Sequence, residues 1–250
     1  MQHMLRGDNV ALIACRLLST GSWQHVLATQ NISERSLVSN KSREASYHIP
    51  LYLKPISNDE TGLFADGETR ENLTPAFRKW LNQKYGTVFT PEQIFGYIYA
   101  VLHSRTYRTR YNDLLKLDFP RIPFVDDADM FVATAALGWD LVQVHLMRDI
   151  PDNIAVPLVG AGDGMVRKME YHAAQQRLAI NDSQYFDNIP PDIWSFRIGG
   201  YDVLDKYLKE RKKAGRPLTL DEIQHVPKIV NILAATIQKM DGIEQNFCCP

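Results

Sequence analysis

The chain has 250 residues, 45% of them hydrophobic and 23% charged, and its formal net charge at pH 7 is −1. This composition excludes an intrinsically disordered chain, and the length is sufficient for one large domain or two smaller domains with a proper core. The near-zero charge argues against a free-standing nucleic-acid binder, because any such surface would have to be a local concentration of cations.

The number of cysteines and the lengths of the apolar runs indicate the cellular compartment in which the protein is expected. Cys15, Cys248 and Cys249 are an odd number without metal-ligand spacing, which is typical of a reducing compartment. No signal peptide is evident, and no apolar run approaches the length of a membrane span. We therefore expect a cytoplasmic protein with no membrane contact, no bound metal and no cofactor.

The first third of the chain is expected to be rich in β-structure. Short apolar runs at residues 10–14 and 25–29, and an alternating run at 47–53, predict three strands. The polar residues 56–72 that follow predict an exposed loop.

Helices are expected next, and capping sequences mark where they begin. Thr74 before Pro75 predicts a helix that ends at Gly86, and a full capping box from Thr90 to Gln93 starts the following helix. A third helix is predicted over residues 129–147. Its inward face is expected to comprise Met130, Ala133, Leu137, Leu141 and Val144.

Residues 154–198 again predict short strands. The glycines at 160–164 predict a hairpin turn, and the prolines at 188–192 predict a stiffened turn before a strand.

Two helices are expected to close the chain, one over residues 201–213 and one that starts with a capping box at Thr219. Pro227 is expected to break the second helix near His225. Apolar residues on this helix form a coiled-coil-like seam, which comprises Ile223, Val226, Val230, Leu233, Ile237 and Met240.

Taken in chain order, these elements predict an α+β fold. Residues 1–89 are expected to form a β-rich recognition part, residues 90–150 a helical support part, and residues 151–250 a small β segment with closing helices. We expect all three to be parts of one module.

Three patterns could indicate catalysis, and none has the context that its chemistry requires. The glycines at 160–164 lack the Lys-Ser/Thr of a P-loop and the spacing of the dinucleotide fingerprint. A faint likeness to the Asn-Pro-Pro-aromatic loop of amino-methyltransferases fails because Ile189 intervenes and Asp192 replaces the aromatic residue. Asp192 with Glu210 and Lys212 fits a loose nuclease pattern, but the last two lie on a predicted helix. We therefore expect no catalytic activity in this chain.

Three other segments carry residue types that contact DNA. The loop at residues 34–43 is polar and basic and lies between two predicted strands, so its side chains could reach base edges and phosphates. Its candidate residues are Arg35, Ser39, Asn40, Lys41 and Arg43. An ordinary solvated loop is the alternative, because loops are polar by default.

The second segment, residues 103–111, interleaves three arginines with two tyrosines, which can pair with phosphates and stack on sugars or bases. Its candidate residues are Arg105, Tyr107, Arg108 and Arg110. The alternative is a helix whose tyrosines pack inward while its arginines are solvated or paired with acids.

The third segment is the predicted helix at 201–213, where Lys206, Lys209 and Lys213 share one face. A phosphate-contacting ridge is one interpretation of this face, and a solvated outer face is the other. Lys206 and Lys209 are therefore included among the candidate DNA contacts.

The longest distinctive block of sequence covers residues 90–104 (TPEQIFGYIYAVLHS), 107–111 (YRTRY) and 118–124 (DFPRIPF). A second block covers residues 194–209 (WSFRIGGYDVLDKYLK), and a weaker one comprises residues 34–35 (ER), 39–41 (SNK) and 50–53 (PLYL). Together these blocks, which span nearly the whole chain in order, resemble the C-terminal specificity domain of Type ISP restriction–modification enzymes.

The members of this family are single-chain fusions of nuclease, helicase-like translocase, coupler, methyltransferase and target-recognition domains. The resemblance implies a non-catalytic module that reads a short asymmetric sequence in double-stranded DNA and presents it to the methyltransferase. The implied partners are DNA and the methyltransferase and helicase/nuclease domains of the parent enzyme. A fragment that retains nuclease or methyltransferase activity, or a protein-interaction scaffold built on the seam at residues 223–240, remains an alternative.

Overall fold

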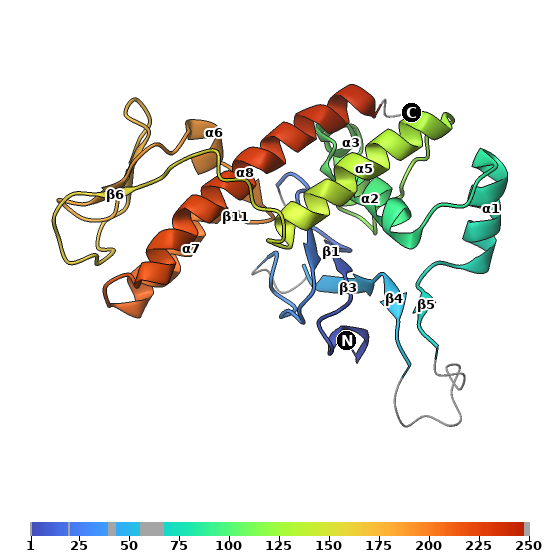
Figure 1. The fold of residues 1–250 in the computed structure, drawn as a ribbon, viewed down its shortest axis with the longest axis horizontal. Helices are drawn as coiled ribbons and strands as arrows, with labels where there is room; N and C mark the ends of the chain where they lie inside the picture. Colours follow the sequence, from blue (N-terminus) through green and yellow to red (C-terminus); the bar gives the residue numbers. More distant parts are fainter. Residues whose placement is uncertain (1, 20, 40–43, 56–67, 248–250) are drawn as a thin grey trace. The chain divides into compact units, whose positions relative to one another are not determined.

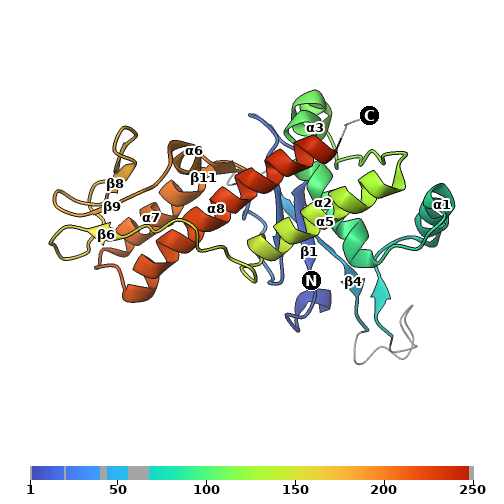
Figure 2. The same cartoon turned by 45° about the horizontal axis from the view of Figure 1, so that its top comes forward.

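The structure is a computed structural model that describes residues 2–19, 21–39, 44–55 and 68–247. The chain forms two compact units (Figures 1 and 2). The first unit comprises Met1–Arg148 and Lys239–Pro250, and the second unit comprises Asp149–Gln238. Each unit contains helices and antiparallel strands, which confirms the predicted α+β class. The three-part division at residues 89 and 150 stays a prediction.

The first unit contains an antiparallel sheet in the strand order β2-β1-β3. Its strands are β1 (Ala11–Cys15), β2 (Val26–Thr29) and β3 (Ser46–Pro50), close to the predicted positions. Every residue of β1 is buried, as expected for a central strand flanked on both edges.

A second, two-stranded sheet pairs β4 (Tyr52–Leu53) with β5 (Arg70–Glu71). The predicted loop at residues 56–72 is therefore wrong at its end, because residues 70 and 71 pair with the chain that leaves β3. Residues 56–67 lie outside the described part of the chain.

The helices of the first unit are η1 (Gln2–Met4), α1 (Pro75–Tyr85), α2 (Pro91–His103), α3 (Arg105–Arg110), α4 (Asn112–Leu115) and α5 (Ala128–His145). Three of them, α1, α2 and α5, match the predicted ones, and α3 matches the helix considered as the alternative for residues 103–111, whereas η1 and α4 were not predicted. The caps predicted for α1 and α2 are confirmed. Thr74 accepts a hydrogen bond from the Phe77 amide, and Thr90 forms a complete capping box. Gly86 ends α1 with a positive φ of 67°, which favours glycine.

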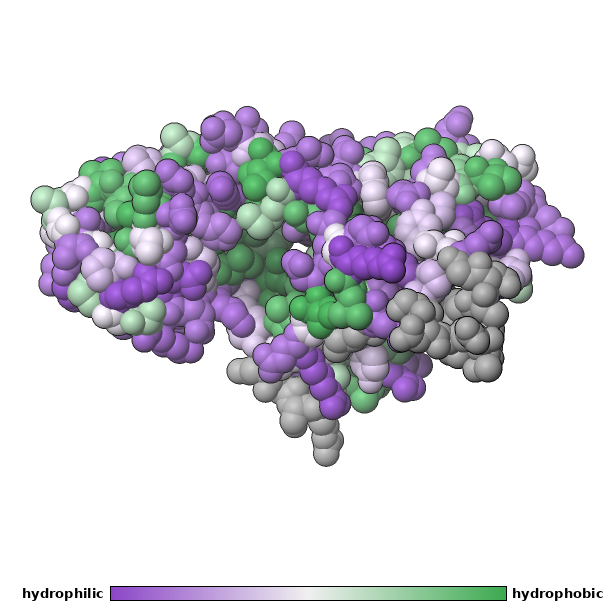
Figure 3. Space-filling view, turned by 60° about the horizontal axis from the view of Figure 1, so that its bottom comes forward, coloured by the Kyte–Doolittle hydropathy of each residue, from purple (hydrophilic) through white to green (hydrophobic). Residues whose placement is uncertain are grey.

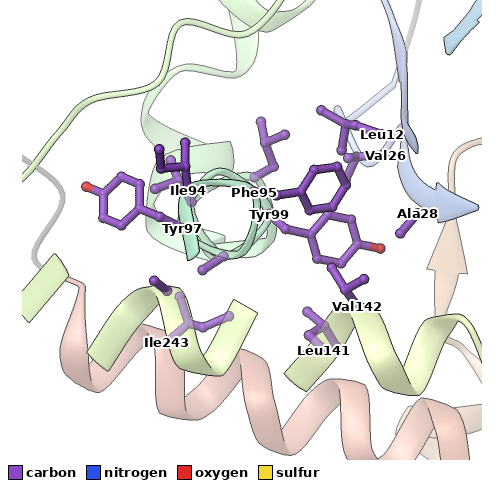
Figure 4. Packing of buried hydrophobic residues seen from close by; sticks show 14 of the residues in the cluster. Leu12, Val26, Ala28, Ile94, Phe95, Tyr97, Tyr99, Leu141, Val142 and Ile243 are labelled. Carbon is purple, nitrogen blue, oxygen red and sulfur yellow. The ribbon is translucent and has the colours of Figure 1, made fainter. Parts of the chain in front are cut away.

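Helix α2 is buried on all sides and forms the centre of this unit. Figure 4 shows it end-on, with Leu12 and Val26 of the sheet on one side and Leu141 of α5 on another. Because nine of its thirteen residues are buried, most of its surface is removed from water.

Helices α2 and α5 approach so closely that their backbones touch through two glycines. A Cβ atom placed on Gly138 would lie 1.9 Å from the carbonyl oxygen of Gly96, and one placed on Gly96 would lie 2.3 Å from the Ala135 carbonyl oxygen. Only glycine fits at these two positions.

The predicted inward face of α5 is therefore partly wrong. Leu141 and Val144 are buried as expected, but Ala133 is exposed, and Thr134 and Gly138 are buried instead. Hydrophobic periodicity could not predict the burial of Thr134 and Gly138, because neither side chain is large and apolar. Gly138 is buried because α2 lies so close to it.

The second unit contains an antiparallel sheet in the order β6-β9-β8-β7 and a β10-β11 hairpin. Its strands are β6 (Leu158–Val159), β7 (Glu170–His172), β8 (Arg177–Ala179), β9 (Tyr185–Phe186), β10 (Arg197–Ile198) and β11 (Tyr201–Asp202). Its helices are α6 (Pro191–Trp194), α7 (Val203–Ala214) and most of α8 (Leu220–Asn246).

Two predicted turns of this unit are corrected by the sheet order. The glycines at 160–164 do not form a hairpin, because β6 pairs with β9 rather than with the next strand. The prolines at 190 and 191 precede helix α6 rather than a strand, and Pro191 takes the first helical position, where its missing amide is tolerated.

The break predicted near His225 is wrong, since α8 continues through Pro227. Packing on both sides of the proline explains this, because Val226 and Val230 are fully buried. The Asn231 side chain also donates to the Pro227 carbonyl oxygen at 2.9 Å. The predicted burial of the seam is confirmed, with Leu233 only 2% exposed in the hydrophobic cluster of this unit.

The glycine contact between α2 and α5 predicts the consequence of Gly138→Ala. The added methyl group would overlap the Gly96 carbonyl, so the helices would have to move apart, at a loss of about 2 kcal/mol or more in the free energy of unfolding. Denaturant titration monitored by circular dichroism measures this loss.

Gly242→Ala in α8 is the matched control, because its Cβ would meet Leu137 at an ordinary 3.6 Å. That variant should be neutral or more stable by up to about 1 kcal/mol, owing to the higher helix propensity of alanine. Equal stability of Gly138→Ala and the wild type would contradict the close contact.

Candidate nucleic-acid interface

The loop that precedes β3 presents Arg35 to solvent. The Arg35 carbonyl oxygen accepts a hydrogen bond from the Ser46 amide at 2.8 Å, which holds this residue beside the outer edge of β3. Within the described part of the chain, the Arg35 guanidinium has no carboxylate partner. Its exposed charge therefore remains available for a phosphate.

Ser39, unlike Arg35, is buried. It is only 3% exposed, and its hydroxyl donates to the buried carboxylate of Glu44, which Ser19 also contacts. These bonds join Ser39 and Ser19 to Glu44, two residues before β3. The candidate residues Asn40, Lys41 and Arg43 lie outside the described residues.

The second candidate segment forms α3, and two of its four candidate residues point inward. Tyr107 is 1% exposed, and its hydroxyl donates to the Arg121 carbonyl oxygen at 2.7 Å. Arg108 donates from Nε to the Leu102 carbonyl oxygen at 2.6 Å, and its guanidinium lies 5.9 Å from the Trp23 ring. Both side chains fix α3 against the core.

The other two arginines of α3 lie at the surface. Arg105 forms an ion pair with Asp241 of α8, and Glu244 accepts hydrogen bonds from the amides of Arg105 and Thr106 at the start of α3. Arg110 is exposed, with its guanidinium 5.5 Å from the Tyr111 ring. Inward packing of a tyrosine and pairing of an arginine both match the structural alternative considered for this segment, and its DNA contacts stay predictions.

The third candidate segment is α7, which buries Leu204 and Leu208. Lys209, Lys212 and Lys213 are exposed, whereas Lys206 is half-buried. The Lys206 ammonium lies 3.3 Å from the centre of the Tyr201 ring, and Lys209 pairs with Asp205 at 2.6 Å. Lys212 is exposed and has no ion pair among the described residues. The helix thus carries more cations than acids along its exposed side.

The three sequence patterns that could have indicated catalysis form no catalytic arrangement among the described residues. The Gly164 amide donates to Gln184 Oε1 at 2.8 Å, and a Cβ on Gly160 would lie 1.9 Å from the Ser183 carbonyl oxygen, so the glycine loop packs against the protein itself. Asp192 lies in α6, whereas Glu210 and Lys212 lie in α7. Among the described residues, no group of three or more His, Cys, Asp or Glu side chains is placed to hold a metal ion.

Sequence reasoning missed an exposed aromatic pair in the first unit. Tyr47 and Phe119 are 44% and 37% exposed, and their rings meet edge to face with centroids 5.1 Å apart. The Arg16 guanidinium lies 6.0 Å from the Phe119 ring and donates to Asp118 at 2.8 Å. The alternation of β3 could have predicted the exposure of Tyr47, but no local pattern connects it to Phe119.

Phe119 also borders a hollow of about 480 Å³ that extends to Tyr107, Leu114, Leu117 and Arg121. Leu114 and Leu117 are about two-thirds exposed. Figure 3 shows one face of the molecule, where hydrophobic areas interrupt a mostly hydrophilic surface. Exposed apolar side chains gathered around a hollow are typical of an interaction site.

Residues 1–242 match the family described as the Type ISP C-terminal specificity domain. The chain belongs to this family. A specificity domain is the non-catalytic part of a Type ISP enzyme, whose catalytic parts lie in other domains. No protein among the curated sequences matches the chain.

Three solved structures share the fold of this specificity domain. The cryoEM structure of a DrdV–DNA complex has a TM-score of 0.73 at 21% identity and covers 96% of this chain and 25% of that chain. The ATP-dependent Type ISP restriction–modification enzyme LlaBIII bound to DNA has a TM-score of 0.65 at 18% identity, over 96% of this chain and 16% of that chain. A nuclease-deletion mutant of the Type ISP enzyme LlaGI, in complex with a DNA substrate mimic, has a TM-score of 0.60 at 20% identity, over 95% and 21%. The specificity domain thus spans a quarter or less of each of these chains.

None of the described helices combines the length and the apolar character that crossing a membrane requires.

A buried polar cluster lies beneath α3 in this specificity domain. The Tyr99 hydroxyl lies 2.6 Å from His145 Nδ1, and His103 Nδ1 lies 2.8 Å from the Tyr99 carbonyl oxygen. Burial, together with a smaller effect of the Arg108 charge, lowers the pKa of His145 to about 4. Burial, and after it the charge of Arg108, also holds the pKa of His103 well below its usual value.

These two histidines predict that the domain loses stability in mild acid. The unfolded chain takes up a proton on each histidine near pH 6.5, whereas the folded chain does not, so stability falls as the pH drops below about 6.5. For His145 the loss should approach about 3 kcal/mol by pH 4, from the size of its pKa shift. Urea titrations between pH 7.5 and pH 4 measure it.

His145→Asn keeps an acceptor for Tyr99 but cannot be protonated, so its stability should depend less on pH over this range. The exposed His172→Asn is the control and should follow the wild type. A pH dependence in His145→Asn as steep as in the wild type would show that His145 is not held neutral.

Proposed function

We propose that this chain recognises a short sequence in double-stranded DNA for a restriction–modification enzyme whose catalytic domains lie elsewhere. The observation that carries the proposal is the family match, which covers residues 1–242 of the 250. It is supported by the fold shared with DrdV, LlaBIII and LlaGI, each of which is described in complex with DNA or a DNA mimic.

The partners in this proposal are duplex DNA and the methyltransferase and helicase/nuclease domains of a parent enzyme. A module with a net charge of −1 has no strong general attraction for a polyanion. Binding would therefore depend on a few exposed cations, and the other domains of the enzyme would supply further contacts to the duplex.

The candidate residues have two different roles in this proposal. The side chains proposed to reach DNA are those of the exposed residues Arg35, Arg105, Arg110 and Lys209 and of the half-buried Lys206. Asn40, Lys41 and Arg43, which lie outside the described residues, are proposed to reach DNA as well. Ser39, Tyr107 and Arg108 are buried or directed inward and would act by holding the loop and α3 in place.

The proposal predicts a change in the salt dependence of DNA binding when an exposed cation is removed. Arg35→Ala and Lys209→Ala should each weaken binding to specific and random duplexes alike, because phosphate contacts carry no sequence information. Each should lower the slope of log K against log salt by about 0.9, the value for one lost phosphate contact. Fluorescence anisotropy with a labelled duplex at several salt concentrations measures both quantities.

Lys228→Ala is the matched control, because Lys228 is an exposed lysine of α8 outside the proposed surfaces. It should keep the affinity and the salt slope of the wild type. If Arg35→Ala and Lys209→Ala do so as well, the proposed phosphate contacts are wrong.

A further inference from the structure

The exposed pair of Tyr47 and Phe119, together with Arg16, forms a surface that we call the aromatic patch. Within the described residues the Tyr47 hydroxyl has no hydrogen-bond partner, and its ring, which is 44% exposed, meets that of Phe119 edge to face. Exposed aromatic side chains in contact with each other leave a large apolar area in water, which is unfavourable unless a ligand covers it.

The patch is held rigidly, although its side chains are exposed. Tyr47 lies in β3, paired with Ala14 of the central strand. The Phe119 amide donates to Asp118 Oδ1 at 2.9 Å, and the Leu18 amide donates to the Lys116 carbonyl oxygen at 3.0 Å. These bonds join the chain after β1 to the segment before Phe119, so the two rings are presented in a defined geometry.

One arginine contacts the aromatic patch, and two others are close to it in the fold. Arg16 lies against Phe119, and Arg121 lines the same hollow as Phe119. The backbone of Arg35 is hydrogen-bonded to that of Ser46, the residue before Tyr47. Arg35 and Arg121 are exposed and have no ion pair with any described residue. Aromatic faces among unpaired guanidinium groups complement a ligand with planar rings and negative charges.

We infer that the two rings of the aromatic patch make a non-ionic contact to duplex DNA, in which Tyr47 and Phe119 lie against a base or a deoxyribose while neighbouring arginines meet the phosphates. This inference rests on the proposed function and adds residues that the sequence did not indicate. Apolar side chains that lie against or between bases are a common device of DNA-binding proteins.

The exposed leucines nearby favour a different ligand, a protein. Leu114 and Leu117 lie at the same hollow and carry no charge that would attract DNA. The cations favour DNA for the part of the surface that contains Tyr47 and Phe119, because protein–DNA interfaces are more positively charged than protein–protein interfaces.

The experiment compares variants of the full 250-residue chain for binding to a labelled mixed-sequence duplex across a salt series. Tyr47→Ala and Phe119→Ala should each weaken binding about 5- to 150-fold, the range for loss of one stacking contact. The slope of log K against log salt should stay at the wild-type value, because no phosphate contact is lost. Tyr47→Phe, which keeps the ring, should bind like the wild type.

Two controls separate stacking from other effects. Arg121→Ala should lower the salt slope by about 0.9, unlike the aromatic variants. Trp80→Ala removes an aromatic side chain of α1 that is also 44% exposed, and it should leave binding unchanged. Melting curves of every variant ensure that the comparison is made between folded proteins.

Alanine variants that bind as tightly as the wild type would overturn the inference and leave this surface to a protein partner. An equal loss of binding in Trp80→Ala would also overturn it, since the effect would not belong to the patch. If the wild-type chain shows no salt-dependent binding to DNA at all, the proposed function fails and the inference fails with it.

Discussion

The contact between Gly96 and Gly138 is the constraint on which the rest of the first unit depends. It lets α2 and α5 approach until backbone meets backbone, and α2 is then buried between α5 and the sheet. The end of α2 in turn determines where α3 begins, because Ser104 caps α3 directly after the last residue of α2. This start of α3 fixes where the next part of the chain lies, which carries Arg105, Arg110 and Phe119.

Polar groups beneath α3 add a second constraint to this arrangement. Arg108 reaches back to the Leu102 carbonyl oxygen, and His103 and His145 stay uncharged beside it. Glu244 meets the amides at the start of α3, where a negative charge is favourable. The surface arginines of this segment are therefore presented by a helix whose own position is fixed from below.

Local features of the fold could be predicted from the sequence, because their causes are local. The caps at Thr74 and Thr90 depend on residues within one turn, and the burial of β1 depends on a continuous apolar run. The features that could not be predicted depend on partners distant in sequence. The exposure of Ala133 and the continuity of α8 through Pro227 are both decided by what packs against the helix.

The candidate site also has features that local sequence predicts and features that depend on residues distant in the chain. Residue types pointed to loops and helices rich in arginine and lysine, but only tertiary contacts show that Tyr107 and Arg108 face inward while Arg35 remains exposed. Tyr47 and Phe119 became a candidate contact only when the fold brought β3 and the segment after α4 together.

The central claim, that this specificity domain reads a DNA sequence, is tested most directly by selection from a library of random duplexes. The purified chain would be used to enrich bound duplexes over several rounds, followed by sequencing. The account predicts enrichment of one short asymmetric sequence over the random background. Binding without enrichment of any sequence would contradict it, because the chain would then hold DNA only through its phosphates.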